Sequence, residues 1–265
     1  MIIMPYHDSG DLIHYITKGF YNIHWYTKIF RLRDIALGLE QIHELNIIHK
    51  DFHSGNIFFN NQANYFITGR VVIGDLGISK SAIESGDDNE NYGIIPYMAP
   101  EIFQRQKYSK SSDIYSYGMI MWELMTGRKP FWDRNHDTEL IIDICDGLRP
   151  PIVTNQAPGG YIELMKECWH SDPSKRPTAG DIRKKLRSIF GSGAKIIGSS
   201  DIGPVPKNNP GAIYKSRPLS AMINSAMSLR SSRSQSINLE KLKRRFEDDL
   251  IEDNNDYGMI IVNYK

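Results

Sequence analysis

The segment from Ile47 to Phe59 constrains the fold most strongly, because it sets a polar loop between two short apolar runs. The flanking runs are β-branched or aromatic, which is typical of buried strand ends that hold a loop still. Within the loop lie His49, Asp51 and Asn56. On a tight loop the carboxylate and the carboxamide can converge on one point, where the first accepts a proton and the second offers an oxygen to Mg²⁺. This combination favours phosphoryl transfer.

Two further motifs follow the loop in the order in which protein kinases carry them. Residues 49–56 match the kinase catalytic loop, His-Arg-Asp followed by four residues and Asn, with Lys in place of Arg. Residues 75–77, Asp-Leu-Gly, stand where kinases have the metal-binding Asp-Phe-Gly, and residues 99–101 supply the Ala-Pro-Glu that closes the activation segment. The chain therefore resembles the protein kinase family. The run from His53 to Asn56 is most similar to the tyrosine-kinase-like group, whose members mostly phosphorylate Ser and Thr.

The resemblance covers residues 1–190 and implies only the C-terminal lobe of a kinase. The pattern at residues 112–118 resembles the buried central helix of that lobe, and those at 168–169 and 176–177 resemble its C-terminal helices. We therefore predict a mainly α fold with a short β-hairpin at the active site. The Gly-rich loop, the strand Lys and the helix Glu that complete the ATP site are not in the sequence. On this basis the N-terminal β lobe is expected to be absent and the chain to be an N-terminally truncated copy.

The resemblance implies an enzyme that uses ATP and Mg²⁺ to phosphorylate Ser or Thr of a protein substrate, with Tyr left open. Because the phosphate-gripping Lys is missing, we expect the 265-residue chain to have little activity and a version with an N-terminal lobe to be active. The alternative is a catalytically inactive kinase fragment, or pseudokinase, that works as a binding or regulatory module.

Asp51 is the catalytic residue that the resemblance implies, since it would accept the proton of the attacking hydroxyl. Asn56 and Asp75 would hold Mg²⁺, although an Asx turn at each position is the structural alternative. The residues implied to contact ATP or its metal are Met4, Pro5, His7, Asp11, His53, Asn56, Phe58 and Asp75.

Residues 1–12 resemble the hinge between kinase lobes. By that analogy the backbone around Pro5 and His7 would bind adenine, Met4 would lie at the back of the pocket, and Asp11 would face the ribose. A frayed N-terminal strand without a ligand is the alternative. Phe58 would lie under the adenine, or as an alternating strand residue it would belong to the core.

Several residues are expected to support the loop. Glu101 and Arg176 would form a buried ion pair, and Asp113 would hydrogen-bond back to the catalytic loop unless it merely caps a helix. His49 is expected to be structural, supporting the loop and the residue after Asp75.

Two positions depart from the kinase pattern. Lys50 replaces an Arg, and an ammonium group cannot form the planar two-bond contact of Arg with a phosphate. Ile94 stands where many serine/threonine kinases place a Thr that bonds the catalytic Asp.

Hydrophobic periodicity predicts a long buried helix between Trp25 and Leu45. A hairpin of Ile57–Phe59 and Val71–Ile73 would place Asp75 beside Asn56. Cap residues and Gly/Pro breaks predict further helices at Ser112–Met125, Asp137–Cys145, Tyr161–Trp169 and Thr178–Ile189.

Composition excludes several other classes. The net charge of +1 argues against a general nucleic-acid binder, and no apolar stretch approaches the roughly 18 residues of a membrane span. Cys145 and Cys168 are too few for a disulfide framework, so we expect reduced thiols and a cytoplasmic protein.

Beyond the kinase-like region, residues 191–265 are rich in Ser, Gly, Asn, Pro and Arg. Such a composition buries too little apolar surface to offset the entropy of ordering, so we predict a disordered tail. Within it, residues 237–252 carry apolar positions at helical spacing and could form a short helix that binds a partner.

Overall fold

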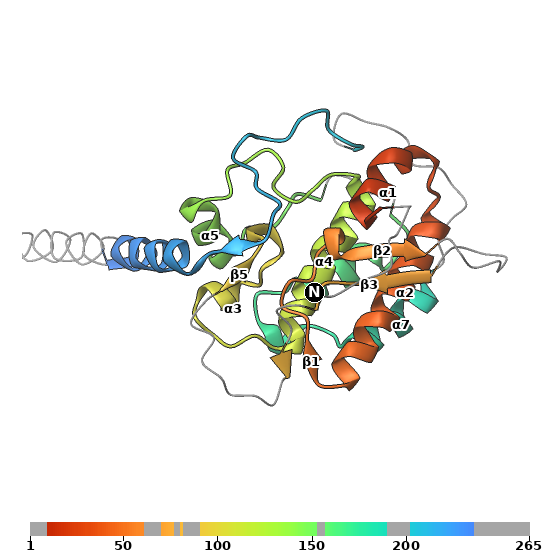
Figure 1. Ribbon diagram of the computed structural model, residues 1–265, viewed down its shortest axis with the longest axis horizontal. Helices are drawn as coiled ribbons and strands as arrows, with labels where there is room; N and C mark the ends of the chain where they lie inside the picture. Colours follow the sequence, from red (N-terminus) through yellow and green to blue (C-terminus); the bar gives the residue numbers. More distant parts are fainter. Residues whose placement is uncertain are drawn as a thin grey trace, which may run out of the picture.

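One buried helix, α4, lies at the centre of this computed structural model (Figure 1). The structure describes residues 10–60, 70–76, 80–81, 91–152, 157–189 and 202–235. The helices are α1 (Leu12–Gly19), α2 (Trp25–Glu44), α3 (Pro100–Phe103), α4 (Lys110–Thr126), α5 (Thr138–Cys145), α6 (Tyr161–Cys168) and α7 (Ala179–Ser188). The strands are β1 (Ile47–Ile48), β2 (Ile57–Asn60), β3 (Arg70–Ile73), β4 (Lys80–Ser81), β5 (Tyr92–Gly93) and β6 (Arg217–Pro218). They form the antiparallel pairs β1–β4, β2–β3 and β5–β6, so the predicted mainly α fold with a short hairpin is confirmed.

Helix α4 is held at both ends by local chemistry. At its start Ser109 and Ser112 form a reciprocal capping box, and at its end Gly127 takes the left-handed conformation, with φ of 74°. All residues from Ser112 to Thr126 are buried. Gly118 allows α6 to approach closely, because a Cβ there would lie 3.0 Å from the Cys168 Cβ.

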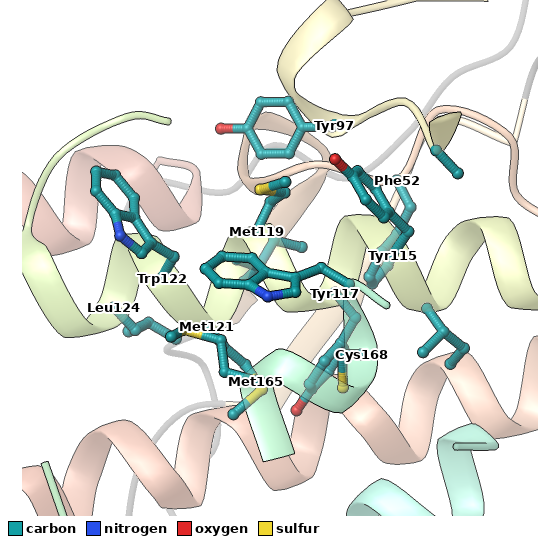
Figure 2. Packing of buried hydrophobic residues seen from close by; sticks show 14 of the residues in the cluster. Phe52, Tyr97, Tyr115, Tyr117, Met119, Met121, Trp122, Leu124, Met165 and Cys168 are labelled. Carbon is teal, nitrogen blue, oxygen red and sulfur yellow. The ribbon is translucent and has the colours of Figure 1, made fainter. Parts of the chain in front are cut away.

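The core is built around this helix. Figure 2 shows side chains of α4 packed with residues from the catalytic segment and from α6; the labelled members are Phe52, Tyr97, Tyr115, Tyr117, Met119, Met121, Trp122, Leu124, Met165 and Cys168. The segment that carries the catalytic loop is thus fixed to the most buried part of the lobe.

Helix α2 is the predicted long scaffold helix and packs against α7 and the hairpin strand β3. Its buried stripe follows the predicted spacing of three and four, with Trp25, Ile29, Leu32, Ala36, Leu39 and His43 all buried. The other predicted helices are also confirmed, with ends that differ by at most two residues. Among the described residues, no helix is both long enough and apolar enough to cross a membrane.

The structure differs from the predicted disordered tail over residues 202–235. This stretch packs on the lobe through Ile202, Leu219, Ile223 and Ala226, whose exposed fractions are 5%, 1%, 1% and 0%. It pairs with β5 through β6, and residues 220–235 are helical. The average composition of the tail was misleading, because a few apolar residues at helical spacing suffice when a complementary surface is already present. Residues 190–201 and 236–265, including the predicted helix at 237–252, lie outside the described residues.

Candidate active site

Asp113 of α4 anchors the catalytic loop. Its Oδ2 lies 2.8 Å from His43 Nε2 and accepts a hydrogen bond from the His49 backbone N–H at 2.9 Å, while its Oδ1 accepts one from the Lys50 N–H at 3.0 Å. Lys50 has a φ of 70°, which lies in the left-handed region that residues other than Gly rarely adopt. The hydrogen bonds to Asp113 therefore stabilise a strained turn. The predicted hydrogen bonds from Asp113 to the catalytic loop are confirmed. The alternative, that Asp113 is the N-cap of α4, is wrong, because that position is taken by Ser109.

Asp51 and Asn56 lie within this loop and are both 8% exposed. The Asn56 Nδ2 donates to the Asp51 backbone oxygen at 2.9 Å, which leaves the Asn56 side-chain oxygen as the atom that can bind a cation. The Asp51 Oδ2 lies 3.6 Å from His53 Nε2. Burial alone would raise the pKa of Asp51, but hydrogen bonding by His53 and by Ser216 outweighs it and holds that pKa below its usual range. Asp51 is therefore a carboxylate at neutral pH, as a proton acceptor must be.

The β2–β3 hairpin returns the chain to the catalytic loop just before Asp75. Ile57 pairs with Ile73, and the Gly74 N–H donates to the Asn56 backbone oxygen at 2.8 Å, so Asp75 follows directly beside Asn56. Asp75 is exposed and has a φ of 58°. The predicted hairpin is confirmed and brings Gly74, the residue before Asp75, onto Asn56; a metal site shared by Asn56 and Asp75 stays a prediction.

His49 is buried and structural in the sense predicted, but its partner differs. Its Nε2 lies 3.0 Å from the backbone oxygen of Gly74, the residue before Asp75 rather than after it. The reason is the left-handed turn at Asp75, beyond which Leu76 faces solvent with 46% of its surface exposed.

The donor set fits Mg²⁺. This ion prefers oxygen ligands, usually one or two from the protein, and takes the rest from water and substrate phosphates. The Asn56 amide oxygen and the Asp75 carboxylate are such a pair, held by adjacent ends of one hairpin.

Asp11 and Phe58 form an isolated β-bridge, so the two residues assigned to ribose and adenine do come together. Asp11 also caps α1, because its Oδ1 accepts a hydrogen bond from the His14 N–H at 2.8 Å. Met4, Pro5 and His7 lie outside the described residues.

Glu101 and Arg176 form the predicted buried ion pair. Two parallel bonds of 2.7 Å join the guanidinium to the carboxylate, and Arg176 also donates to the backbone oxygens of Ser111 and His170 at 2.9 and 2.8 Å. The pair ties the Ala-Pro-Glu motif to the start of α7. Lys50, the replacement for Arg, places its Nζ 5.2 Å from the centre of the Tyr108 ring.

The buried carboxyl group of Glu123, which the sequence analysis did not identify, hydrogen-bonds to the catalytic loop at Ser54. Glu123 of α4 is completely buried, and its Oε1 accepts hydrogen bonds from Tyr97 at 2.6 Å and Ser54 at 3.0 Å. Its other oxygen has no hydrogen-bond partner within the described part of the chain. The signal in the sequence was a Glu inside the apolar run Met-Trp-Glu-Leu-Met.

Burial raises the pKa of Glu123 to about 8 and outweighs the hydrogen bonds from Tyr97 and Ser54. The folded state therefore keeps a proton that the unfolded chain loses above its ordinary pKa of about 4.5. Glu123 should therefore lower the free energy of unfolding by about 1.4 kcal/mol per pH unit between those values. We expect Glu123→Gln to lack this contribution, so that in urea unfolding its stability relative to wild type should rise steadily from pH 5.5 to 7.5. Above that range Lys28, whose pKa burial lowers to about 7, adds the opposite slope in both proteins.

The matched control for this pH series is Glu163→Gln, which changes an exposed Glu on α6 and should leave the wild-type slope intact. Equal pH slopes for wild type and Glu123→Gln would show that Glu123 is ionised in the folded protein.

Comparisons with known proteins agree with this geometry. The family model described as protein tyrosine and serine/threonine kinase matches residues 1–186. The chain is 31% identical over 199 residues to the probable serine/threonine-protein kinase roco5 of Dictyostelium discoideum, which covers 72% of this chain and 7% of that protein. It is 31% identical over 182 residues to the serine/threonine/tyrosine-protein kinase HT1 of Arabidopsis thaliana, covering 68% of this chain and 45% of the relative.

A putative serine/threonine-protein kinase/receptor of Acanthamoeba polyphaga mimivirus is 30% identical over 190 residues, which is 71% of this chain and 11% of that protein. The chain thus spans less than half the length of each of these three relatives. The match to the family model and the order of the motifs lead to one conclusion: the chain belongs to the protein tyrosine and serine/threonine kinase family.

Proposed function

We propose that this protein transfers the γ-phosphoryl group of ATP to a Ser or Thr hydroxyl of a protein, as a member of the tyrosine-kinase-like group. The observation that carries the proposal is the joining of Asp51, Asn56 and Asp75 by one loop and one hairpin. Phosphoryl transfer depends mainly on such positioning and on charge stabilisation.

Each of the three residues has one task in this proposal. Asp51 orients the acceptor hydroxyl and takes its proton, for which its lowered pKa keeps it ionised. Asn56 and Asp75 hold Mg²⁺, which would neutralise charge on the phosphates when bound. Asp113, through its bonds to the loop backbone, keeps Asp51 in place.

A second candidate is a binding or regulatory module without catalysis. It is favoured by the packing of residues 202–235 on the lobe. A module of this kind would bind a partner without needing the Asp51 carboxylate.

The deciding experiment measures transfer of labelled phosphate from ATP to a mixture of Ser, Thr and Tyr peptides at increasing Mg²⁺. It compares the 265-residue chain with a version that carries an N-terminal lobe with a Gly-rich loop. We expect transfer in the second, and a higher Mg²⁺ requirement after Asp75→Asn. No transfer by either protein would favour the binding module.

We also propose a reducing compartment such as the cytoplasm. Cys145 and Cys168 are both free thiols, and burial raises the pKa of the Cys145 thiol to about 11 and that of Cys168 still further. Such thiols are unreactive toward disulfide formation at neutral pH.

A further inference from the structure

Residues 202–219 run over the lobe to β5, with which β6 pairs, and then lead into the helical residues 220–235 (Figure 1). At the start of this path the Gly203 N–H donates to the Thr126 oxygen at 2.7 Å. Farther along, the Asn209 N–H donates to the Trp132 oxygen at 2.8 Å. The backbone of the crossing segment is thus held by the loop that follows α4.

The segment then adds a strand to the end of the activation segment. Tyr92 is paired with Pro218 and Gly93 with Arg217, and the Leu219 N–H donates to the Asn91 oxygen at 2.7 Å. An extended peptide that pairs with an exposed strand is a common mode of peptide recognition. The burial of Leu219, only 1% exposed, fixes the register.

This register brings Ser216 to the catalytic loop. Ser216 is one position beyond the Gly93–Arg217 pair, opposite Ile94, and its side chain is among the groups near Asp51 that lower the pKa of that carboxyl. Ser216 is half-buried, so its hydroxyl is not sealed in the core.

The residues on both sides of Ser216 are anchored through His136. The Tyr214 ring packs edge-on against the His136 ring at 4.8 Å, and the Tyr214 hydroxyl donates to the Pro130 oxygen at 2.8 Å. On the other side the Arg217 Nη2 donates to the His136 oxygen at 2.9 Å. Ser216 is held between two fixed neighbours, which is the positioning that a reacting group needs.

We propose that residues 212–219 occupy the protein-substrate site of their own lobe and that Ser216 is an intramolecular phosphorylation site. The inference rests on the proposed function, because it requires the Asp51 carboxylate to act as the proton acceptor.

The reaction balances without any further reactant. The Ser216 Oγ forms a bond to the γ-phosphorus of ATP as the bond from that phosphorus to the β,γ-bridging oxygen breaks, and ADP leaves. The Ser216 proton passes to the Asp51 carboxylate. The product is a phosphoserine with a charge of about −2 beside a second acidic group, and their repulsion releases the segment and opens the site to other proteins.

Docking of the segment can be tested without catalysis. Residues directly opposite in an antiparallel pair have Cα atoms about 4.5–5.5 Å apart, which a disulfide can span. The full 265-residue chain carrying Tyr92→Cys and Pro218→Cys should cross-link under mild oxidation, as seen by a mobility shift on a non-reducing gel. The control pair, Tyr92→Cys with Ser225→Cys, should not. Equal cross-linking of both pairs, or of neither, would overturn the docked arrangement.

Phosphorylation is tested in the version that carries the N-terminal lobe, with an external Ser peptide assayed in the same tube. We expect mass spectrometry to find phosphate on Ser216, at a rate that does not change with protein concentration, as for an intramolecular reaction. Ser216→Ala should lose that phosphate, whereas the control Ser225→Ala, on the exposed helix, should keep it. Leu219→Asp should release the segment, lower Ser216 phosphorylation and speed transfer to the peptide.

The outcomes separate the two proposals. Transfer to the peptide with no phosphate on Ser216 would overturn the intramolecular site alone, and would make Ser216 a structural partner of Asp51. Transfer to neither acceptor would overturn the proposed function and this inference with it.

Discussion

Replacement of Asp51 by Asn is expected to lower phosphoryl transfer by a factor of roughly 10² to 10⁴, because the amide cannot accept the proton of the attacking hydroxyl. The substitution keeps the size of the side chain and leaves the backbone oxygen that accepts the Asn56 hydrogen bond. The loss should therefore appear in kcat, with little change in stability. The measurement is initial-rate transfer to a peptide by the version with an N-terminal lobe.

The matched control is Asp143→Asn, which changes a carboxylate on the surface of α5 that pairs with Arg134. It should retain the wild-type rate. ATP binding, followed by fluorescence titration, should be nearly unchanged in Asp51→Asn. A variant that loses binding together with rate, or that keeps more than about a tenth of the rate, would contradict the role of Asp51 as base.

Replacement of Arg176 by Met is expected to destabilise the lobe by about 3–5 kcal/mol, because it leaves the buried Glu101 carboxylate without its partner. Glu101 is only 4% exposed, so water cannot take over the two lost bonds. The measurement is the free energy of unfolding from urea titration. The double variant Glu101→Gln with Arg176→Met should be less destabilised than the sum of the single variants.

Arg183→Met is the matched control, since Arg183 pairs with Glu40 at 2.6 Å in a partly exposed position. Removal of that Arg should cost no more than about 1 kcal/mol, because water can solvate the Glu that remains. Similar costs for the two Arg variants would mean that the Glu101–Arg176 pair is no more than a surface contact.

Local patterns were sufficient for most of the architecture. The spacing of apolar residues predicted α2, and the Asp137 and Thr178 caps marked the starts of α5 and α7. These signals are readable because caps and helix faces depend on residues three or four positions apart. The same holds for the hairpin, whose two strands lie close in the sequence and bring Asn56 and Asp75 together.

Local patterns failed where partners are far apart in the sequence. Nothing near Glu123 indicates that Tyr97 and Ser54 will hydrogen-bond to it, or that its pKa will rise to about 8. Nothing within residues 202–235 indicates which surface the segment will cover. Its few buried apolar residues are a weak signal on average, and only the pre-existing surface of the lobe makes their burial favourable.

The sequence alone therefore determined the family, the helices and the residues of the catalytic loop, because each rests on a short spacing of residue types. The tertiary structure decided what faces that loop. It brought the segment around Ser216 to the end of the activation segment through strand pairing between residues more than a hundred positions apart. Backbone pairing of this kind is nearly independent of side-chain identity, so no motif in either strand records it.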